Sequence, residues 1–414
     1  MALLPTTLGT RPRLAVEIRP EGVVAARSED AQALVSAVAY AVLAEGLVVP
    51  GLKEGNIAGR AEIVAAVRKT LEAVALKERQ ATVVVPDASV RVLLLDFDAL
   101  PAKAGEALPI VRFRLKKMLP FDADDAVVSY QVMSTQRGMV RVLAVAVPKE
   151  VLAEYESVVR EAGFEPGAVL PSTLAACAGL AEMEAAALLV NAGETSITTA
   201  IVKGAVLLLH RTVDLAAEGL HEQVEAAHLP ALEVPQELLA GYQPEAALPL
   251  VDRESTAGEW AMQEPLNGYG VIDDDRISAE AHVQAKRLAE EISAEAEIPA
   301  EVAAPVPREE MLPPLPTKFE LEERRLSAAA REVTQAVSVA AAYFEDTLQM
   351  APGVVLAAGT MGADVLATLL REAGFGEGEM RVREIVEPVM LTGGAEGTRV
   401  PQGWMAGVRG ALRS

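Results

Sequence analysis

Alternating apolar and polar positions mark two strand–turn–strand units in this chain. The clearer unit runs from 187 to 213, where apolar stretches flank a small polar turn at 191–196. A fainter unit at 14–27 has the same layout, with its turn at 19–22. Short alternating runs bounded by glycine-containing turns are typical of antiparallel strands. Because one such unit opens about each half of the chain, the pattern predicts an internal duplication.

Apolar residues at helical spacing predict helices between and after these strands. In the stretch 56–75, one face carries Ile63, Val67, Leu71 and Val74, as expected of an amphipathic helix. The pattern also predicts a strand at 81–85 closed by Pro86-Asp87, a long helix at 319–347, a strand at 353–358, a helix at 363–373, a strand near 382–385 and a closing helix at 404–412. Helices that alternate with strands indicate an α/β protein.

The stretch 108–165 is predicted to form a small α/β unit of its own. It contains a helix at 109–118, strands at 127–133 and 140–147, and a second helix at 149–162. Pro109 suits the first turn of the first helix, because its missing N–H is not needed there. That helix is unusually basic for so acidic a chain. A face of this kind is either solvated or a docking surface for an acidic or extended partner.

Composition limits what the chain binds. Its 414 residues suffice for two domains, and the net charge of −22 argues against nucleic acid and anionic lipid as partners, since both need a basic surface. The single cysteine, Cys177, fits a reducing compartment and is predicted to lie buried in an alanine-rich helix. The four histidines share no metal-ligand spacing, so we expect surface or packing residues and no metal site. Residues 1–10 lack a signal-peptide pattern, and we expect a cytoplasmic protein without direct membrane insertion.

One long segment differs in character from the rest. Eleven of the 25 prolines lie between Pro230 and Pro316, together with acid-rich stretches at 272–275 and 290–301. A helix at 280–294 is compatible with the pattern. The remainder is predicted to be a solvated, partly disordered insertion, because it has too little apolar patterning to build a core.

A series of motifs resembles PilM, the family of actin-like cytoplasmic proteins of type IV pilus assembly. The most specific is FRLKKMLPFDADDAVVSY at 113–130, which is similar to the segment around the family's Pro-Phe pair. The others are the glycine-bounded lead-in at 51–57, VPDASVRV at 85–92, the run 142–174 and the ending AGVRGALR at 406–413. The resemblance covers about 13–225 and 320–413, and the proline-rich insertion has no counterpart in it.

The resemblance implies an α/β, actin-like fold of the sugar kinase, Hsp70 and actin type, with two domains. A small α/β subdomain replaces the usual one in domain 1, and the acidic, proline-rich insertion belongs to domain 2. In the implied division, residues 1–107, completed by 400–414, form the core of domain 1, residues 108–170 the small subdomain, residues 171–229 and 319–399 the two parts of domain 2, and residues 230–318 the insertion.

The resemblance also implies a function. PilM-type proteins bind the cytoplasmic N-terminal tail of the membrane protein PilN and so join the inner-membrane platform of the pilus. The tail groove would lie between domain 1 and the small subdomain, near the basic helix, at Arg112, Phe113, Lys116, Lys117, Leu119, Pro120 and Phe121. We therefore expect a cytoplasmic scaffold held at the inner membrane by a PilN-like partner. Assembly with further copies of this chain stays open.

The first phosphate turn of the family departs from its pattern in this sequence. Actin-like ATPases hold phosphates between two glycine-containing hairpin turns, because backbone N–H groups must approach the phosphate oxygens closely. The family's first turn has Asp, Gly and a later Lys, where this chain has Glu17, Arg19 and Val24. Pro20 removes one N–H donor, and Glu21 adds a charge that repels phosphate. Arg19 facing a phosphate is the alternative that preserves binding.

The second turn and the adenosine turn are better preserved. Gly193 and Thr195 match the family's pattern, but Asn191 replaces its Asp and Glu194 adds another carboxylate. The adenosine turn is represented by Gly359 and Thr360. Two like charges about 4 Å apart repel by roughly 4 kcal/mol at an effective dielectric of 20. We therefore predict a degenerate cleft with at most weak binding of ATP and Mg²⁺, no catalytic residue and no hydrolysis.

Two other classes of function compete with the scaffold. An active ATPase or kinase of the same superfamily needs a carboxylate near the γ-phosphate, and neither Glu17 nor Asn191 is a convincing one. Related scaffolds include the actin-like part of a type II secretion component, which continues into a membrane span, and an FtsA-like division protein, which ends in an amphipathic membrane helix. The ending at 404–413 instead matches the closing helix of PilM.

Overall fold

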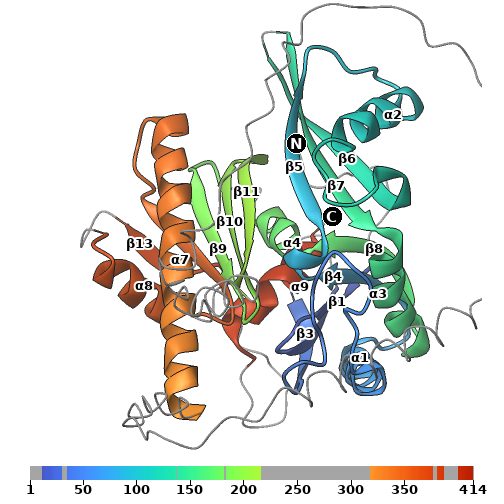
Figure 1. The fold of residues 1–414 in the computed structure, drawn as a ribbon. Helices are drawn as coiled ribbons and strands as arrows, with labels where there is room; N and C mark the ends of the chain where they lie inside the picture. The colour runs from blue at the N-terminus through green and yellow to red at the C-terminus, as the bar shows by residue number, and fades with distance from the viewer. Residues whose placement is uncertain are drawn as a thin grey trace, which may run out of the picture. The chain divides into compact units, whose positions relative to one another are not determined.

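Two five-stranded sheets with the same strand order form the frame of the molecule. The computed structural model describes residues 12–29, 35–136, 138–180, 183–215, 318–375, 380–386 and 400–413. The first sheet has the order β3-β2-β1-β4-β8 and the second β11-β10-β9-β12-β13 (Figure 1). The strands of the first sheet are β1 (Leu14–Ile18), β2 (Gly22–Ser28), β3 (Val35–Val42), β4 (Gln80–Val85) and β8 (Glu165–Pro171). Those of the second are β9 (Ala187–Ala192), β10 (Ser196–Lys203), β11 (Val206–Asp214), β12 (Val354–Gly359) and β13 (Arg381–Glu384).

The two sheets repeat each other strand by strand. In each, the central strand pairs antiparallel with the strand that follows it, β1 with β2 and β9 with β10. On its other side it pairs parallel with a later strand, β1 with β4 and β9 with β12. Both central strands are buried throughout, which explains their continuous apolar runs. The predicted duplication is thus confirmed in the order and direction of the strands.

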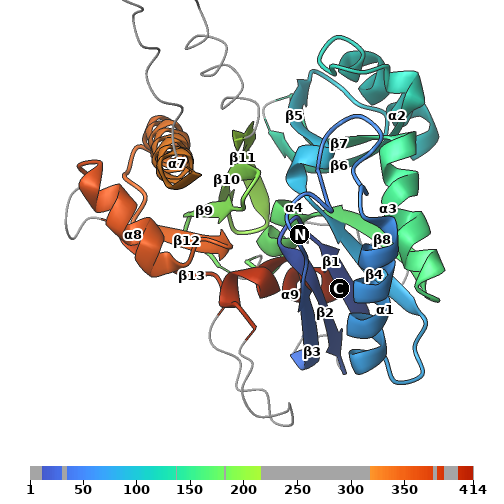
Figure 2. The same ribbon diagram turned by 60° about the horizontal axis from the view of Figure 1, so that its bottom comes forward.

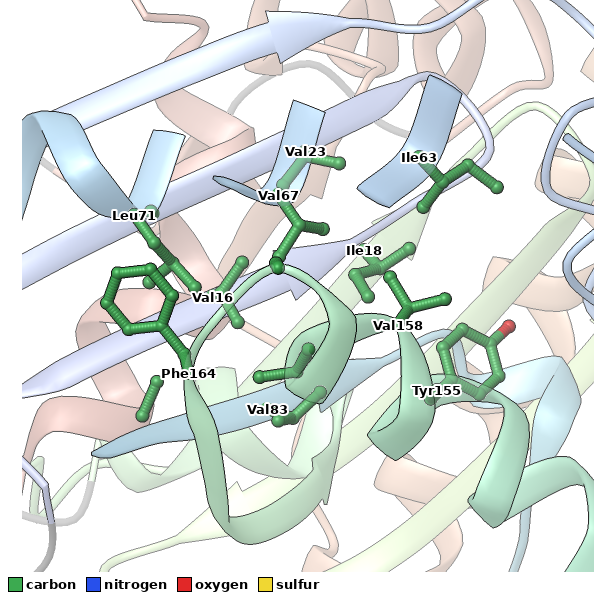
Figure 3. Packing of buried hydrophobic residues seen from close by; sticks show 14 of the residues in the cluster. Val16, Ile18, Val23, Ile63, Val67, Leu71, Val83, Tyr155, Val158 and Phe164 are labelled. Atoms are coloured by element: carbon green, nitrogen blue, oxygen red, sulfur yellow. The ribbon is translucent and has the colours of Figure 1, made fainter. Parts of the chain in front are cut away.

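The first sheet is covered on one face by two helices, α1 (Arg60–Val74) and α3 (Lys149–Glu161). The predicted helical stripe of α1 is buried here, and Figure 3 shows Ile63, Val67 and Leu71 packed with side chains of the sheet. Tyr155 of α3 lies in the same cluster, fully buried, with its hydroxyl 3.1 Å from the Ser89 hydroxyl. This buried hydrogen bond satisfies the one polar atom that the tyrosine brings into the core.

Two short helices, α4 (Ser172–Ala178) and α9 (Met405–Leu412), lie between the two sheets (Figure 2). They pack on the first sheet through Ala175, Val408 and Ala411, and on the second through Leu174 and Met405. Small residues let them approach closely. A Cβ placed on Gly410 would lie 1.7 Å from the carbonyl oxygen of Ala175. The closing helix therefore serves both halves of the chain.

The other face of the second sheet carries α7 (Lys318–Leu348) and α8 (Ala363–Glu372). Val333, Val337 and Phe344 of α7 pack there against Val190 and Ile201. The helix, predicted at 319–347, is confirmed with nearly the same bounds. No helix among the described residues is long and apolar enough to cross a membrane.

A third, three-stranded sheet has the order β5-β7-β6 and is covered by α2 (Ala104–Leu115). Its strands are β5 (Arg91–Phe97), β6 (Ala126–Gln136) and β7 (Met139–Pro148). On the face away from α2, Leu143 packs into the cluster of α4 and the second sheet. The small sheet therefore includes β5, which precedes the predicted subdomain boundary at residue 108. Helix α3, which was predicted to belong to the small subdomain, packs on the first sheet. The domain boundaries as a whole stay a prediction.

The place predicted for Pro109 is wrong. Because α2 begins at Ala104, Pro109 lies in its second turn and removes the hydrogen bond to the carbonyl of Gly105. Gly105 is exposed, so water can take the place of that bond. The insertion predicted at 230–318 lies outside the described residues except for Lys318, the first residue of α7, and its predicted helix at 280–294 lies wholly outside them.

Candidate functional site

A small polar cavity opens where the hairpin turns of the two sheets meet. Its walls come from the ends of β1 and β9, the turn after β4 and the first residue of α4, and it holds about 340 Å³ of empty space, including the part open to solvent. Of the predicted nucleotide residues, Glu17, Arg19, Asn191, Gly193 and Thr195 line it. The sequence thus identified residues that are more than 170 positions apart in the chain and line the same cavity in the fold.

The two turns are equivalent in position. After β1, the N–H of Arg19 donates to the carbonyl of Gly22 at 2.9 Å, and after β9 the N–H of Gly193 donates to the carbonyl of Ser196 at 2.9 Å. Arg19 therefore occupies the place that Gly193 has in the second turn. Two residues earlier, Glu17 is the counterpart of Asn191.

Arg19 lies between two buried carboxylates. Its Nη1 donates to Glu17 Oε1 at 3.1 Å and its Nε to Glu21 Oε2 at 3.2 Å, while Trp404 lies 5.9 Å from the guanidinium carbon. All three charged side chains are at most 7% exposed. Burial raises the pKa of Glu17, although Arg19 and a hydrogen bond from Ser172 act against that rise. Burial alone would lower the pKa of Arg19, but Glu17 and Glu21 outweigh it and raise that pKa.

The carboxylate of Glu21 reaches the second turn. Its Oε1 accepts a hydrogen bond from the backbone N–H of Glu194 at 2.8 Å. The N–H groups of Arg19, Gly193 and Glu194 therefore all donate to oxygens of the protein itself. These are the donors that a phosphate between two such turns would need.

Asp87 is a site residue that the sequence reasoning did not single out. It is 4% exposed and accepts hydrogen bonds from the N–H of Thr173 at 3.1 Å and from its hydroxyl at 2.5 Å. Asn191 Nδ2 lies 3.4 Å from the same carboxylate and also donates to the hydroxyls of Ser172 and Thr173, at 3.1 and 3.0 Å. One signal was present, because Pro86-Asp87 closes a buried strand parallel to β1, at the edge where Glu17 lies.

His210, predicted as a surface or packing residue, is buried beside this cluster. Its side chain is 4% exposed, and Nε2 lies 3.8 Å from Asp87 Oδ1, beyond hydrogen-bond distance. Cys177 is fully buried as predicted, and burial raises the pKa of its thiol, which disfavours the reactive thiolate form.

The predicted adenosine turn packs against the second hairpin. The N–H and hydroxyl of Thr360 both donate to the carbonyl of Ala192, at 2.8 and 3.1 Å. Gly359 has φ +88°, and a Cβ there would lie 2.2 Å from that carbonyl oxygen. Only glycine fits this close approach of two backbones.

The residues predicted for the partner groove divide into inward-facing and exposed ones. Arg112 donates to the carbonyls of Ala123 and Ala126, and Leu119 and Phe121 pack on the core of the small sheet. Lys116 forms an ion pair with Asp124 at 2.6 Å. Lys116 is nevertheless exposed, as are Phe113, at 69%, Lys117 and Pro120. Four of the seven thus already have structural contacts, and partner binding by the set stays a prediction.

No protein-family model matches the sequence, and no curated protein matches it either. Among solved structures, a chain of the PilM–PilN type IV pilus biogenesis complex is similar at 17% identity with a TM-score of 0.53, over 87% of this chain and 87% of that one. The cytoplasmic domain of EpsL, an inner-membrane component of the type II secretion system of Vibrio cholerae, matches at 15% identity and TM-score 0.33, over 50% of this chain and 73% of that one.

The ethanolamine utilization protein EutJ of Carboxydothermus hydrogenoformans matches at 9% identity and TM-score 0.38, over 98% of this chain and 91% of that one. Because the TM-scores of EpsL and EutJ are below 0.5, only the chain of the PilM–PilN complex supports a statement about the fold. With two sheets of the same strand order and a shared cleft, the chain has the actin-like fold seen in PilM.

Proposed function

We propose that this protein is a scaffold of a type IV pilus, or a related secretion platform, that binds the cytoplasmic N-terminal tail of a PilN-like membrane protein. The observation that carries the proposal is the match to the PilM–PilN complex over 87% of both chains. The PilM-like motifs at 113–130 and 406–413 support it. In this proposal the protein is cytoplasmic and lies at the inner membrane through its partner.

The exposed surface of α2 and the turn after it is the proposed docking site. Phe113 is 69% exposed, Met118 48% and Ile110 40%, so an apolar strip lies on the outside of the helix. Arg114 and Lys117 are exposed beside it, and neither has an ion-pair partner among the described residues. Apolar anchors with free cations fit an extended segment that carries aliphatic and acidic side chains.

We further propose that the cleft does not hydrolyse ATP. The donors that phosphates would need are taken, and Glu21 places a buried carboxylate between the turns. Among the described residues, the cluster of Glu17, Glu21 and Asp87 holds one buried arginine or lysine, Arg19, which pairs with both glutamates. An added triphosphate would therefore meet net negative charge at short range, which weakens its binding by several kcal/mol (roughly 4 per pair at 4 Å and a dielectric of 20).

A peptide-binding experiment tests the scaffold. The full chain is titrated with a synthetic cytoplasmic tail of a PilN-like protein from the same genome. We expect saturable binding, and a dissociation constant raised about tenfold or more by Phe113→Ala with Lys117→Glu. Lys77→Glu is the matched charge control, because Lys77 is exposed in the loop between α1 and β4, outside the proposed docking site. This change should leave binding unchanged. Failure of the unaltered chain to bind would contradict the proposal.

Lys116 is left intact in this design, because its reversal would place a like charge against Asp124 and disturb the turn itself. The cleft has a separate test. Calorimetric titration with Mg-ATP is expected to show at most weak binding, and a phosphate-release assay no turnover. A low-micromolar dissociation constant or steady turnover would refute this part and leave the peptide result untouched.

A further inference from the structure

The carboxylate of Glu21 connects the two halves of the molecule with both of its oxygens. Oε2 accepts from Arg19 Nε at 3.2 Å within the first turn, and Oε1 accepts from the N–H of Glu194 at 2.8 Å in the second. The residue is 6% exposed. Its backbone is also fixed, because its carbonyl accepts from the N–H of Leu43 at 3.1 Å. Glu21 therefore has little freedom to turn away from the second hairpin.

The geometry differs from that of an ordinary surface ion pair. Arg27 and Glu29 repeat the same spacing eight residues later in the chain, with Nη1 3.1 Å from Oε1. Glu29 is 70% exposed there, so its pairing contributes little. The Glu21 side chain is only 5% exposed, and a charged acceptor in such surroundings makes a stronger hydrogen bond to a backbone N–H than a neutral one does.

A second bridge lies beside the first. Asn191 Nδ2, from β9, is 3.4 Å from the Asp87 carboxylate at the end of β4. At 3.4 Å this contact is longer and therefore weaker than the 2.8 Å hydrogen bond of the first bridge, so it adds to the first bridge without replacing it. Both bridges join a side chain of one hairpin region to the turn of the other sheet.

We propose that Glu21 is a built-in anionic latch, which binds the N–H of the second turn and holds the two sheets in one relative position, with Arg19 as the residue that positions it. The latch goes beyond the scaffold proposal and does not depend on the identity of the partner. It assigns to a side chain of the chain itself the contact that an anion makes with a turn N–H. A fixed relation between the two sheets keeps the surfaces of a scaffold constant.

Hydrogen exchange followed by mass spectrometry tests the latch in the full chain. In Glu21→Ala, the N–H of Glu194 loses its acceptor, and we expect exchange in the segment 192–196 to accelerate about ten- to hundredfold. Glu21→Gln keeps a neutral acceptor of the same shape and is expected to give an intermediate acceleration. Glu29→Ala, the matched control, leaves this segment unchanged.

A distance measurement reports on the position of the sheets directly. One spin label is attached at Leu76→Cys, next to α1 on the first sheet, and the other at Val365→Cys, in α8 on the second sheet. The two positions are exposed at 74% and 55%, and Cys177→Ala removes the native cysteine. We expect one narrow distance distribution for the parent and a broader or longer one for Glu21→Ala. Unchanged exchange and an unchanged distance in Glu21→Ala would overturn the latch. If that variant does not fold, the same two measurements on Glu21→Gln decide, and no change in either overturns it.

Discussion

The two hairpin turns have equivalent places in their sheets and opposite polar chemistry. The first brings buried charge, with Arg19 between Glu17 and Glu21. The second has neutral residues at two of the equivalent positions, Asn191 and Gly193, and offers N–H donors. Each turn therefore supplies what the other lacks, since Glu21 accepts from the second turn and Asn191 donates toward Asp87 near the first. The two duplicated turns are thus complementary in their hydrogen-bonding groups.

Both sheets pack on the helices α4 and α9, which contact each other at Gly410. Of the changes considered, Gly410→Ala is expected to lower the stability of the protein most. The new Cβ would lie 1.7 Å from the Ala175 carbonyl oxygen, and backbone cannot move away as a flexible side chain can. We expect a loss of more than about 3 kcal/mol in the free energy of unfolding, measured by urea denaturation. Gly105→Ala, exposed in α2, is the control and should stabilise by about 0.5–1 kcal/mol. Equal effects of the two changes would contradict the packing.

Arg19→Gly makes the first turn resemble the second at the position of Gly193. Glu17 and Glu21 then stay buried without their common cation, and breaking a buried ion pair from one side costs about 3–5 kcal/mol. Urea denaturation at pH 7 measures the loss. Adding Glu17→Gln removes one of the two stranded carboxylates, so the double variant should recover part of that loss. A double variant less stable than Arg19→Gly would show that Glu17 does not depend on Arg19.

Asn191→Asp is the reverse exchange, giving the second turn an acid where the first has Glu17. Its Nδ2 lies 3.4 Å from the Asp87 carboxylate, so the change replaces a donor by a second negative charge. We expect a loss of about 2–4 kcal/mol at pH 7, with a smaller loss in acid, where one of the two carboxyls is protonated. Asn191→Leu loses the same hydrogen bonds without adding charge. Equal stability of the two variants at pH 7 would rule out the charge effect.

The fold could be predicted closely from the sequence, because its strongest patterns are periodic and local. The long stripe of α7 and the glycine-bounded strands fixed most boundaries to within a few residues. The place of β5 (Arg91–Phe97) in the small sheet was not predicted, because this strand pairs with β7, about 45 residues later in the chain. No local sequence pattern indicates a pairing over that distance. Pro109 was misplaced because a helix can begin before a proline whose lost bond falls on an exposed carbonyl.

The candidate site was predictable only where the turn motifs carry it. Glu17, Arg19, Asn191, Gly193 and Thr195 were located by their motifs and do share one cavity. Their partners were not predictable, since Arg19 could face a phosphate or a carboxylate and only the packed structure shows it between two glutamates. The places of Asp87 and His210 depend on how the two sheets meet. For Asp87 the sequence holds only one signal, the position of Pro86-Asp87 at the end of a strand, and for His210 it holds none.

The charge difference between Glu17 and its neutral counterpart Asn191 predicts a pH effect. Burial raises the pKa of Glu17 above its ordinary 4.5, so the folded state holds this proton more tightly than the unfolded one. That stability is fully present below pH 4.5 and is lost as pH rises through the raised pKa. In urea denaturation, the free energy of unfolding of Glu17→Gln should therefore rise relative to that of the parent as pH increases from 4 to 7. If the free energy of unfolding of Glu17→Gln instead falls relative to that of the parent as pH rises, the raised pKa of Glu17 is contradicted.

The smallest expected effect concerns Gly193, the residue of the second turn that Arg19 replaces in the first. Its φ is not positive, so the turn does not need glycine for conformation. A Cβ would lie 3.0 Å from Glu21 Oε1, the oxygen that binds the second turn. Gly193→Ala should cost only about 1 kcal/mol, since a carboxylate can shift by a few tenths of an ångström where a backbone cannot.

The cause of that small cost can be isolated by a double-mutant cycle in urea denaturation. If the cost comes from Glu21, it should disappear in a Glu21→Ala background, because the neighbouring atom after Oε1 is the Ser196 carbonyl oxygen at an ordinary 3.6 Å. A cost that is the same in both backgrounds would place its origin in the turn itself. The contact between the turns would then be a consequence of their position and not a reason for the glycine.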